Sequence, residues 1–460
     1  MTFMGVRLIG DGLPVPCLDG VERPYLSLDS AASTAALPAV GERITEFLPW
    51  YSSVHRGAGY KSQMATAAYE EAREAAMRFA GRTGSNDVAI LCRNTTEAIN
   101  HLAYRLQLGP HDVIVTTVTE HHANLLPWAR HGGGRRYVEC DVSGRFTVDD
   151  VIGALDAKPF PRLLAITGAT NVTGWLPPID AIIEAAHARG VAVLVDAAQL
   201  AAHRPMPTDA DYLAWSGHKM YAPFGAGVLV GPRTTFTEGD PFLAGGGAVD
   251  LVDLHEVVWT DPPEREEAGS PNVMGAVALG TAITELEAIG WPAITAHEDA
   301  LAAQLRAGLA AIDGVHLLGP PLDVATLAVA TFTVADTPHA LVAARLSAEF
   351  GIGVRHGCFC AHPYLIRLLD LPPDDIERYR HDVLAGDRTR IPGAVRASAG
   401  ISVTPAEIDR FLDAVTIIAD GDAPPVPYVQ DQATGDYWPA GDEAPWSTGD
   451  RSLGSSCARG

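Results

Sequence analysis

Short, continuously apolar segments recur along the first part of the chain and predict the strands of a buried sheet. Each is rich in β-branched residues and is bounded by polar residues or glycine. A strand that is apolar on both faces is typical of a parallel sheet covered by helices on both sides. The segments are Val88–Cys92, Val113–Thr117, Leu163–Thr167 and Val191–Val195.

Amphipathic patterns with helical spacing lie between these segments. Thr96–Tyr104 is one such pattern, and Ile179–Arg189 is another, with Gly190 placed to end the helix. Strands that alternate with helices indicate an α/β fold. We therefore expect residues 25–285 to form a large α/β domain with a mixed, mostly parallel sheet.

The pattern changes after about residue 290. An Ala-rich helix is predicted over Ala293–Ile312, and helices also over 338–349 and Pro405–Ala419. Strands are predicted over 315–318, 325–334 and 394–399. We expect residues 286–420, together with 1–24, to form a smaller α+β domain. Residues 421–460 are rich in Pro, Gly, Asp and Ser, and we expect an extended, partly ordered tail.

Composition narrows the class of protein. With 460 residues, 47% hydrophobic and 19% charged, the chain is long enough for two globular domains. No apolar run reaches the roughly 18 residues that span a bilayer, and the N-terminus MTFMGVRLIG does not resemble a signal peptide. We expect a cytoplasmic protein without a membrane partner. The net charge of −23 repels phosphate backbones, so nucleic-acid binding is not expected.

Lysine is rare, with three residues against thirty arginines. Arginine stays protonated and cannot form a Schiff base, so a retained lysine is a candidate amine, although three can also survive by chance. Lys219 follows Ser216-Gly-His in a short polar loop. Lys61 and Lys158 have surface contexts. Lys219 is therefore the best candidate for an amine nucleophile.

Polar residues follow several predicted strands, where ligands bind in open α/β sheets. Thr95 or Thr96 is placed to cap a helix whose free amides either bind an anion or are simply capped. Asp196 ends a buried strand and needs a cationic partner. The pyridinium nitrogen of pyridoxal 5′-phosphate (PLP) is one such partner, and a structural ion pair is the other. His121 is placed to stack on an aromatic cofactor. The adjacent His121 and His122 are a poor pair of metal ligands.

The segment Val354–Pro363 contains Cys358 and Cys360 between two histidines. It is either a zinc site or a loop that presents one thiol. The C-x-C spacing, without a second Cys/His cluster, disfavours zinc, and we expect no metal. Nearby Arg355 favours a thiolate. The other cysteines are scattered, and a disulfide framework is not expected.

Eight collinear segments resemble class V aminotransferases, and most closely the SufS-like (group II) cysteine desulfurases and selenocysteine lyases. The resemblance covers about residues 25–420. The segments are Asp29-Ser-Ala-Ala-Ser, Val54-His-Arg-Gly, Arg93-Asn-Thr-Thr-Glu, Glu120-His-His-Ala-Asn, Val195-Asp-Ala-Ala-Gln, Ser216-Gly-His-Lys, Glu267-Ala-Gly-Ser-Pro-Asn and Arg355-His-Gly-Cys-Phe-Cys.

The resemblance implies a PLP-dependent enzyme with the aspartate-aminotransferase-like fold (fold type I) and removal of sulfur from L-cysteine to give alanine. Lys219 would carry PLP as a Schiff base and move the substrate proton, and Cys360 would take the sulfur as a persulfide. The cofactor-binding residues would be Thr95, Thr96, His121, Asp196, Gln199, Ser216, His218 and Ser270. The substrate-binding residues would be Arg396, Asn171, His55, Ala31 and Arg355.

The resemblance also implies partners. Ser270 would reach the cofactor phosphate of a second subunit, so we expect a homodimer with shared active sites, and a sulfur-acceptor protein is a further expected partner. Two stretches depart from the branch. Arg355–Cys360 reads Arg-His-Gly-Cys-Phe-Cys, where typical members of the branch read Arg-Thr-Gly-His-His-Cys, and its Gly-Cys-Phe-Cys part resembles the sulfurase domain of molybdenum-cofactor sulfurases. Gly168-Ala-Thr-Asn replaces the usual His-Val-Ser-Asn. A C–S lyase or epimerase acting on another amino acid is therefore the alternative, and a non-catalytic scaffold is a third reading.

Overall fold

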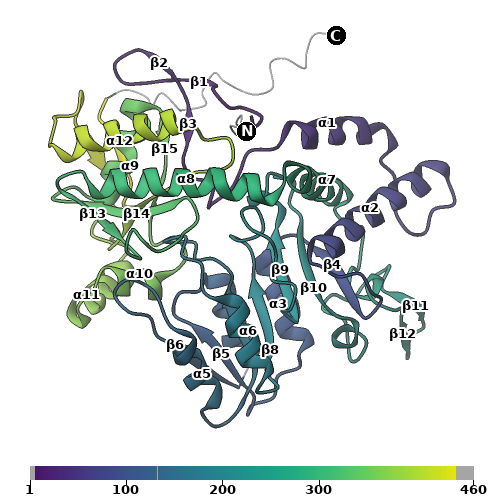
Figure 1. The fold of residues 1–460 in the computed structure, drawn as a ribbon. Coiled ribbons are helices and arrows are strands. Elements are labelled where there is room, and N and C mark those ends of the chain that lie inside the picture. Colours follow the sequence, from purple (N-terminus) through teal and green to yellow (C-terminus); the bar gives the residue numbers. More distant parts are fainter. Residues whose placement is uncertain (1–5, 132, 442–460) are drawn as a thin grey trace.

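The computed structural model describes residues 6–131 and 133–441. The chain forms a seven-stranded sheet and a four-stranded sheet. Figure 1 shows a lobe around each, with a long helix running along the smaller lobe toward the larger one. The larger sheet has the order β4-β10-β9-β8-β7-β5-β6. Neighbouring strands are parallel except at β10, which is antiparallel to both β4 and β9. The predicted mixed, mostly parallel sheet is confirmed. Its strands are β4 (Asp87–Cys92), β5 (Val113–Thr117), β6 (Gly134–Val138), β7 (Pro161–Thr167), β8 (Ala192–Asp196), β9 (Tyr212–Ser216) and β10 (Gly227–Pro232).

Alternate residues of these strands belong to two different apolar cores. Leu163 and Ala165 of β7 pack with one core, whereas Leu164 and Ile166 pack with the other. Successive side chains of a strand point to opposite faces, so both faces of the sheet are buried. This burial explains why the strands read as continuous apolar runs.

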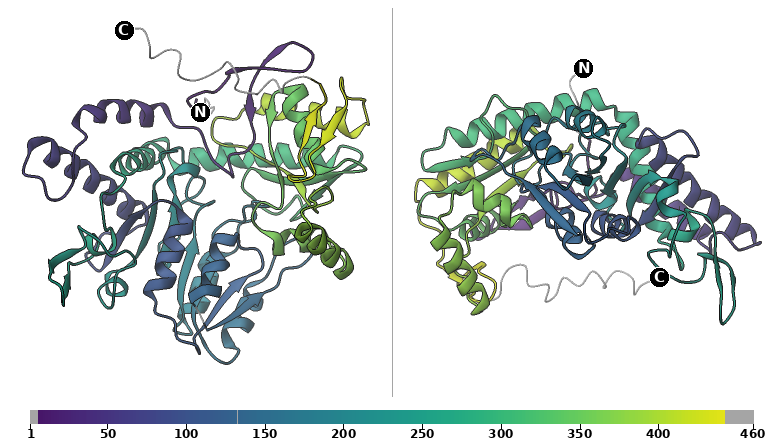
Figure 2. Two further views of the ribbon diagram at one scale, coloured as in Figure 1. Left: turned by 180° about the vertical axis from the view of Figure 1, so that it is seen from behind. Right: turned by 90° about the horizontal axis from the view of Figure 1, so that it is seen from below.

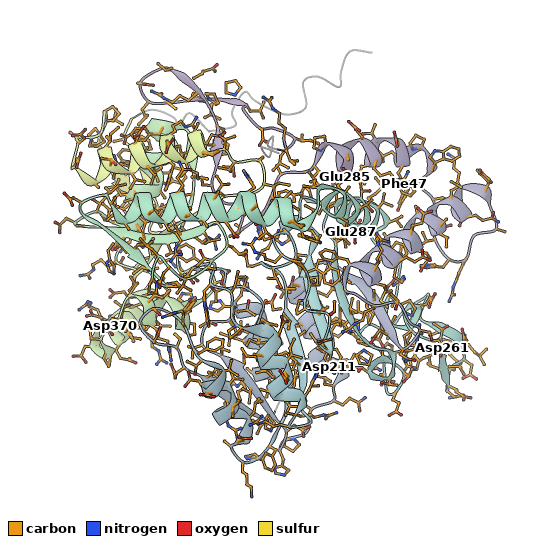
Figure 3. All side chains as sticks on the ribbon, viewed as in Figure 1. Phe47, Asp211, Asp261, Glu285, Glu287 and Asp370 are labelled. Atoms are coloured by element: carbon orange, nitrogen blue, oxygen red, sulfur yellow. The ribbon has the colours of Figure 1, made fainter. Side chains whose placement is uncertain are left out.

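Helices cover both faces of the larger sheet. They are α1 (Pro38–Phe47), α2 (Tyr60–Phe79), α3 (Thr95–Arg105), α4 (Leu126–His131), α5 (Val148–Asp156), α6 (Ile179–His187) and α7 (Val273–Ile289). Glu287 near the end of α7 accepts from Arg78 of α2 at 3.1 Å, and α1, which ends at Phe47, packs against α7 as well (Figure 3). Asp211, just before β9, accepts from His187 of α6 and from the backbone N–H of Val193.

The smaller lobe has an antiparallel sheet in the order β13-β14-β17-β16. Its strands are β13 (Val315–Leu318), β14 (Val329–Val334), β16 (Arg355–Gly357) and β17 (Ala394–Ser398), and its helices are α8 (Trp291–Ala310), α9 (His339–Phe350), α10 (His362–Leu368), α11 (Pro373–Leu384) and α12 (Pro405–Ala419). The predicted helix over Pro405–Ala419 is confirmed residue for residue. The predicted strand over 325–334 begins only at Val329.

Short elements complete the fold. The parallel pair β3 (Leu26–Ser27) and β15 (Ile352–Gly353) ties the N-terminal segment to the smaller lobe. Three antiparallel hairpins are β1 (Pro14–Pro16) with β2 (Glu22–Pro24), β11 (Val249–Val252) with β12 (Val257–Trp259), and β18 (Tyr428–Gln430) with β19 (Tyr437–Pro439). The 3₁₀ turns are η1 (Leu48–Trp50), η2 (His122–Asn124), η3 (Gly217–Lys219), η4 (Arg233–Phe236) and η5 (Glu264–Glu266).

The two ends of the chain differ from the expected outline. Residues 428–439 of the expected extended tail form the β18–β19 hairpin, and residues 442–460 lie outside the described residues. Leu26 and Leu28 pack into the core of the smaller lobe. The domain boundaries near residues 25 and 285 stay a prediction. Figure 2 shows the two lobes from behind and from below.

Among the described residues, no single helix has both the length and the apolar composition to cross a membrane. The consecutive helices α7 and α8 meet these criteria only when taken together, and they are bent by 83°. The bend lies at Gly290, whose φ of +90° suits glycine.

Candidate active site

A cavity of about 1100 Å³ lies between the two lobes. Segments that follow β4, β5, β7, β8 and β9 all contribute to its wall, so the ends of these strands meet at one edge of the sheet. Segments of the smaller lobe from residues 355–362 and 388–396 form the opposite wall. This volume is large enough to hold a small molecule.

Lys219 ends the 3₁₀ turn η3 that follows β9 and is half-buried in the cavity. Burial lowers the pKa of its amine to about 8, with Asp196 raising it and Arg396 lowering it further. A buried amine with a lowered pKa has a larger neutral fraction and is a better nucleophile. Lys61 and Lys158 are exposed, as predicted, and lie away from the cavity.

Asp196 and His121 lie in the same part of the cavity. Asp196 ends β8, is buried, and accepts a hydrogen bond from the backbone N–H of Ala198 at 2.9 Å. Burial raises its pKa, which the Ala198 N–H and Lys219 oppose. His121 accepts from the Ala123 N–H through Nδ1, and burial together with Lys219 lowers its pKa to about 3. The imidazole is therefore neutral, with its proton on Nε2.

The N-terminus of α3 borders the cavity beside β9. Ser216 Oγ lies 2.7 Å from Thr95 Oγ1 and accepts from the Thr95 N–H at 2.7 Å. The prediction that Thr95 or Thr96 caps this helix is wrong, because Asn94 is the N-cap and accepts from the Glu97 N–H at 3.0 Å. The chain enters α3 one residue earlier than the apolar pattern indicates. Both threonines consequently lie in the first turn, where free amides favour an anion.

Glu120 is a buried carboxyl group that the sequence reading gave no role. It is fully buried and accepts hydrogen bonds from Thr117 Oγ1, Asn124 Nδ2 and the Thr167 N–H at 2.7–3.0 Å. Burial raises its pKa to about 8, although these hydrogen bonds lower it. The available signal was the one used for Asp196, an acidic residue shortly after a continuous apolar strand.

Arg396 and Asn171 face each other across the two lobes. Arg396 of β17 is buried and donates to the backbone oxygen of Asn171 at 2.8 Å and to Asp29 at 3.2 Å. Burial lowers its pKa to about 10, with Asp29 raising it. Arg396 Nε and Asn171 Oδ1 are buried and lack a hydrogen-bond partner among the described residues. Such unpaired buried groups indicate the place of a polar ligand.

Cys358 and Cys360 belong to one tight turn between β16 and α10. Phe359 and Cys360 both have left-handed backbone angles, with φ of +54° and +53°, and the Ala361 N–H donates to the Cys358 oxygen at 2.9 Å. Positive φ at both central residues defines a type I′ turn, which costs energy without glycine. Asn171 Nδ2 donates to the Phe359 oxygen and the His122 N–H donates to the Cys360 oxygen, and these bonds fix the turn.

The histidines near this turn have partners of their own. His362 stacks on His122 with ring centroids 5.1 Å apart, and Tyr379 Oη lies 3.0 Å from His362 Nε2. His356 Nε2 lies 3.3 Å from Asp436. Within the described part of the chain, no three His, Cys, Asp or Glu side chains are grouped to hold a metal ion.

Thirteen of the fifteen residues expected at the site line this single cavity. They are Ala31, Thr95, Thr96, His121, Asn171, Asp196, Gln199, Ser216, His218, Lys219, Arg355, Cys360 and Arg396. Gln199 is fixed by a 2.7 Å bond from its Nε2 to the Ala31 oxygen. His55 and Ser270 do not line the cavity of their own chain. His55 lies 2.8 Å from Glu70, and Ser270 is exposed in front of α7.

The chain is similar to a known family and to several cysteine desulfurases. Residues 26–411 match the family model described as "Aminotransferase class-V". A cysteine desulfurase of Klebsiella pneumoniae is 34% identical over 424 residues, which is 90% of this chain and 97% of that protein. A cysteine desulfurase of Haloferax volcanii is 31% identical, covering 89% and 93%. A probable cysteine desulfurase of Mycobacterium leprae is 35% identical, but the chain spans only 63% of its length.

Solved structures agree on the fold. The apo cysteine desulfurase of Thermococcus onnurineus superposes with a TM-score of 0.76 at 31% identity, covering 86% of this chain and 95% of that one. The cysteine desulfurase CsdA of Escherichia coli superposes with a TM-score of 0.71 at 31% identity, covering 85% and 94%.

Proposed function

This chain belongs to the class V aminotransferase family, and from that membership and the cavity we propose that it is a PLP-dependent cysteine desulfurase. The observation that carries the proposal is that one cavity contains an amine with a lowered pKa (Lys219), a buried guanidinium (Arg396) and an accessible thiol (Cys360). These are the three groups that a desulfurase needs to handle the α-proton, the carboxylate and the sulfur of cysteine. The relatives named as cysteine desulfurases support the proposal.

The donor set of the cavity fits PLP. Asp196 offers a buried carboxylate to a ring nitrogen, and neutral His121 offers a flat ring for stacking. The first turn of α3 with Ser216 and His218 offers donors to a phosphate. Lys219 would hold the aldehyde through its amine, and Gln199 would contact the phenolic oxygen. When bound, PLP supplies an electron-accepting ring that stabilises negative charge next to the amino group of the substrate.

Three side chains of the cavity each have a separate role in the proposed reaction. Arg396 binds the substrate carboxylate through a charge-assisted contact, together with Asn171, and so orients the amino acid. Lys219 Nζ takes the α-proton, because its pKa of about 8 lies near neutral pH. Cys360 Sγ attacks the substrate sulfur, so that a carbon–sulfur bond breaks and a sulfur–sulfur bond forms. The net change is balanced, since L-cysteine and the Cys360 thiol give L-alanine and the Cys360 persulfide.

We also propose a homodimer in which Ser270 and His55 serve the cavity of the partner subunit. Both residues lie outside the cavity of their own chain. The β11–β12 hairpin, which leads toward Ser270, presents exposed apolar side chains, including Leu251 and the almost fully exposed Leu254. An exposed apolar patch of this kind marks an interaction surface.

The test is turnover of L-cysteine by the purified holoenzyme. We expect alanine to form together with one additional sulfur atom on Cys360, detected by mass spectrometry of the peptide. Cys360→Ala should leave PLP bound but form no persulfide at this position. Pyruvate and ammonia without a persulfide would instead indicate a C–S lyase, which the altered loop Arg355–Cys360 also permits.

A further inference from the structure

The cavity continues well beyond Cys360 and Arg396 into a space that the proposed cofactor and cysteine do not use. We call this space the outer chamber. Its wall consists of the first residues of α9, His356, Tyr379 of α11, residues 388–393, and the turn of the β18–β19 hairpin through Gln430, Thr434 and Gly435. Its inner end is the turn that bears Cys358 and Cys360. Cys360 therefore lines the same cavity as the residues of the outer chamber, so a molecule bound there shares the cavity with its thiol.

The hairpin wall is held firmly although it lies beyond residue 411, where the family match ends. Gln430 Nε2 donates to the Thr389 oxygen at 2.9 Å, and the Arg388 N–H donates to the Gln432 oxygen at 3.0 Å. Asp436 pairs with His356 at 3.3 Å. A side chain at Gly435 would approach the Arg388 oxygen to 2.5 Å, and the φ of Gly435 is +81°. The wall is thus seated closely on the loop that carries the outer arginines.

The charge of the cavity is opposite to that of the chain. The protein has a net charge of −23, yet five lysine and arginine side chains and a single carboxylate, Asp196, line the cavity. Lys219 and Arg396 serve the cofactor and the substrate carboxylate. The remaining three, Arg355, Arg388 and Arg390, line the outer part, and no acidic side chain among the described residues lines it with them.

Among the described residues, none of these three arginines has a close acidic partner to itself. Arg388 donates to the Ala433 oxygen at 2.9 Å, and Arg390 lies 3.8 Å from Asp382. Arg355 shares Asp29 with Arg396. A recess lined by one sign of charge focuses the field and attracts ions of the opposite sign.

We propose that the outer chamber binds a small, negatively charged nucleophile, such as a thiol with a sulfonate, carboxylate or phosphate group, which removes the sulfur from Cys360. This inference rests on the proposed desulfurase function. The acceptor thiolate attacks the terminal sulfur of the persulfide, the bond between that sulfur and Cys360 breaks, and Cys360 leaves as a thiolate. The acceptor becomes the persulfide, its thiol proton goes to solvent, and no oxidant or reductant is needed.

The first experiment compares three thiols of similar size as acceptors for the holoenzyme with L-cysteine. They are 2-mercaptoethanesulfonate, 2-mercaptoethanol and cysteamine, which are anionic, neutral and cationic, and kcat/KM is compared per thiolate. We expect a preference of at least about threefold for the anionic over the neutral thiol, and a larger one over the cationic thiol. Equal values for the three thiols would overturn the proposal.

Substitutions test whether the preference for the anionic thiol arises in the outer chamber. Arg388→Gln with Arg390→Gln should remove it, and Gly435→Val should weaken it by displacing the hairpin. Arg380→Gln is the matched control, because Arg380 lies on α11, is 72% exposed and does not line the cavity. A preference that survives in the double variant, or that is lost equally in the control, would contradict the assignment to the outer chamber.

A second readout needs no turnover. Iodoacetate and iodoacetamide alkylate the same thiol but differ in charge, so the ratio of their rates at Cys360 reports the local field. We expect Arg388→Gln with Arg390→Gln to lower this ratio at least about twofold, and Arg380→Gln to leave it unchanged. An unchanged ratio in the double variant would overturn the anion site. A lowered ratio in a protein that makes no alanine would support the anion site and refute the desulfurase.

Discussion

At the scale of single residues, Lys219 shows how a rare residue type was informative. Chance survival was an open explanation for the three lysines, but only Lys219 lies in the cavity, whereas Lys61 and Lys158 are exposed. Thr95, His121 and Asp196 were located by their places after strands, whereas Arg396, Asn171 and Gln199 were located by the resemblance to class V aminotransferases. Glu120 was missed although, like Asp196, it follows a continuous apolar strand, because the sequence pattern does not show the hydrogen-bond partners that surround it.

Lys219→Ala is expected to abolish covalent attachment of PLP. Reduction of the wild-type holoenzyme with borohydride should add the mass of the reduced cofactor to the peptide with Lys219, and the variant should lack it. Lys61→Ala is the control, because Lys61 is exposed on α2. Cofactor mass found on Lys61 or Lys158 of the wild type would refute the assignment.

Glu120 is expected to make the apoprotein less stable as the pH rises. Its pKa is about 8 in the folded protein and near 4.5 when unfolded, so the folded state holds one proton more between these values. The stabilisation is complete below the unfolded pKa and is lost as the pH rises through the folded pKa. The free energy of unfolding should therefore fall, relative to Glu120→Gln, by up to about 1.4 kcal/mol per pH unit.

Urea unfolding of both proteins at pH 6 and pH 8 measures this difference. Because the rest of the chain is shared, the comparison removes the general effect of the large negative charge. Parallel pH dependences for wild type and Glu120→Gln would show that Glu120 is already ionised in the folded protein at pH 6.

At the scale of elements, the sheet and the long helices were predictable because burial on both faces and helical periodicity are local in sequence. The start of α3 was not, since Asn94, Thr95 and Thr96 are all good caps and only tertiary contacts select Asn94. The β18–β19 hairpin was missed for a related reason. Its residues are typical of a tail, and it forms because the backbone of residues 388–389 offers partners.

Asn94→Ala is expected to lower the free energy of unfolding by about 1 kcal/mol, because the Glu97 N–H loses its acceptor. Affinity for PLP should fall as well, since the first turn of α3 would be less ordered where the phosphate binds. Thr147→Ala removes the cap of α5, which lies outside the cavity wall. This control should lose similar stability, as measured by urea unfolding, but keep its PLP affinity in a fluorescence titration.

At the scale of the whole molecule, the cavity needs both lobes and, in our proposal, a second subunit. Strand ends and the family resemblance predicted most of the residues that share the cavity, but not its extension to the β18–β19 hairpin, whose sequence is typical of a tail. Ser270 lies outside the cavity of its own chain, which suits its expected role at the partner's cofactor, whereas His55, expected to bind substrate, also lies outside it. The β11–β12 hairpin exposes several apolar side chains, which a second subunit would bury.

Leu251→Asp with Leu254→Asp is expected to shift the protein from dimer to monomer, because two buried apolar contacts would be replaced by charges. Light scattering should give twice the chain mass of 48.6 kDa for the wild type and a lower value for the variant. Val142→Asp is the control, since Val142 is 72% exposed outside the β11–β12 hairpin. A monomeric wild type with full activity would contradict the shared site.

The place of the β18–β19 hairpin at the end of the described chain also has a consequence for biosynthesis. Chains fold from the N-terminus as they are made, so every strand that carries the proposed cofactor site emerges before residues 428–439. The strands that position one subunit's own cofactor-binding residues are thus made while the outer side of the cavity is still open. The β18–β19 hairpin is made after these strands, so PLP has access to its site before the hairpin closes the outer side of the cavity.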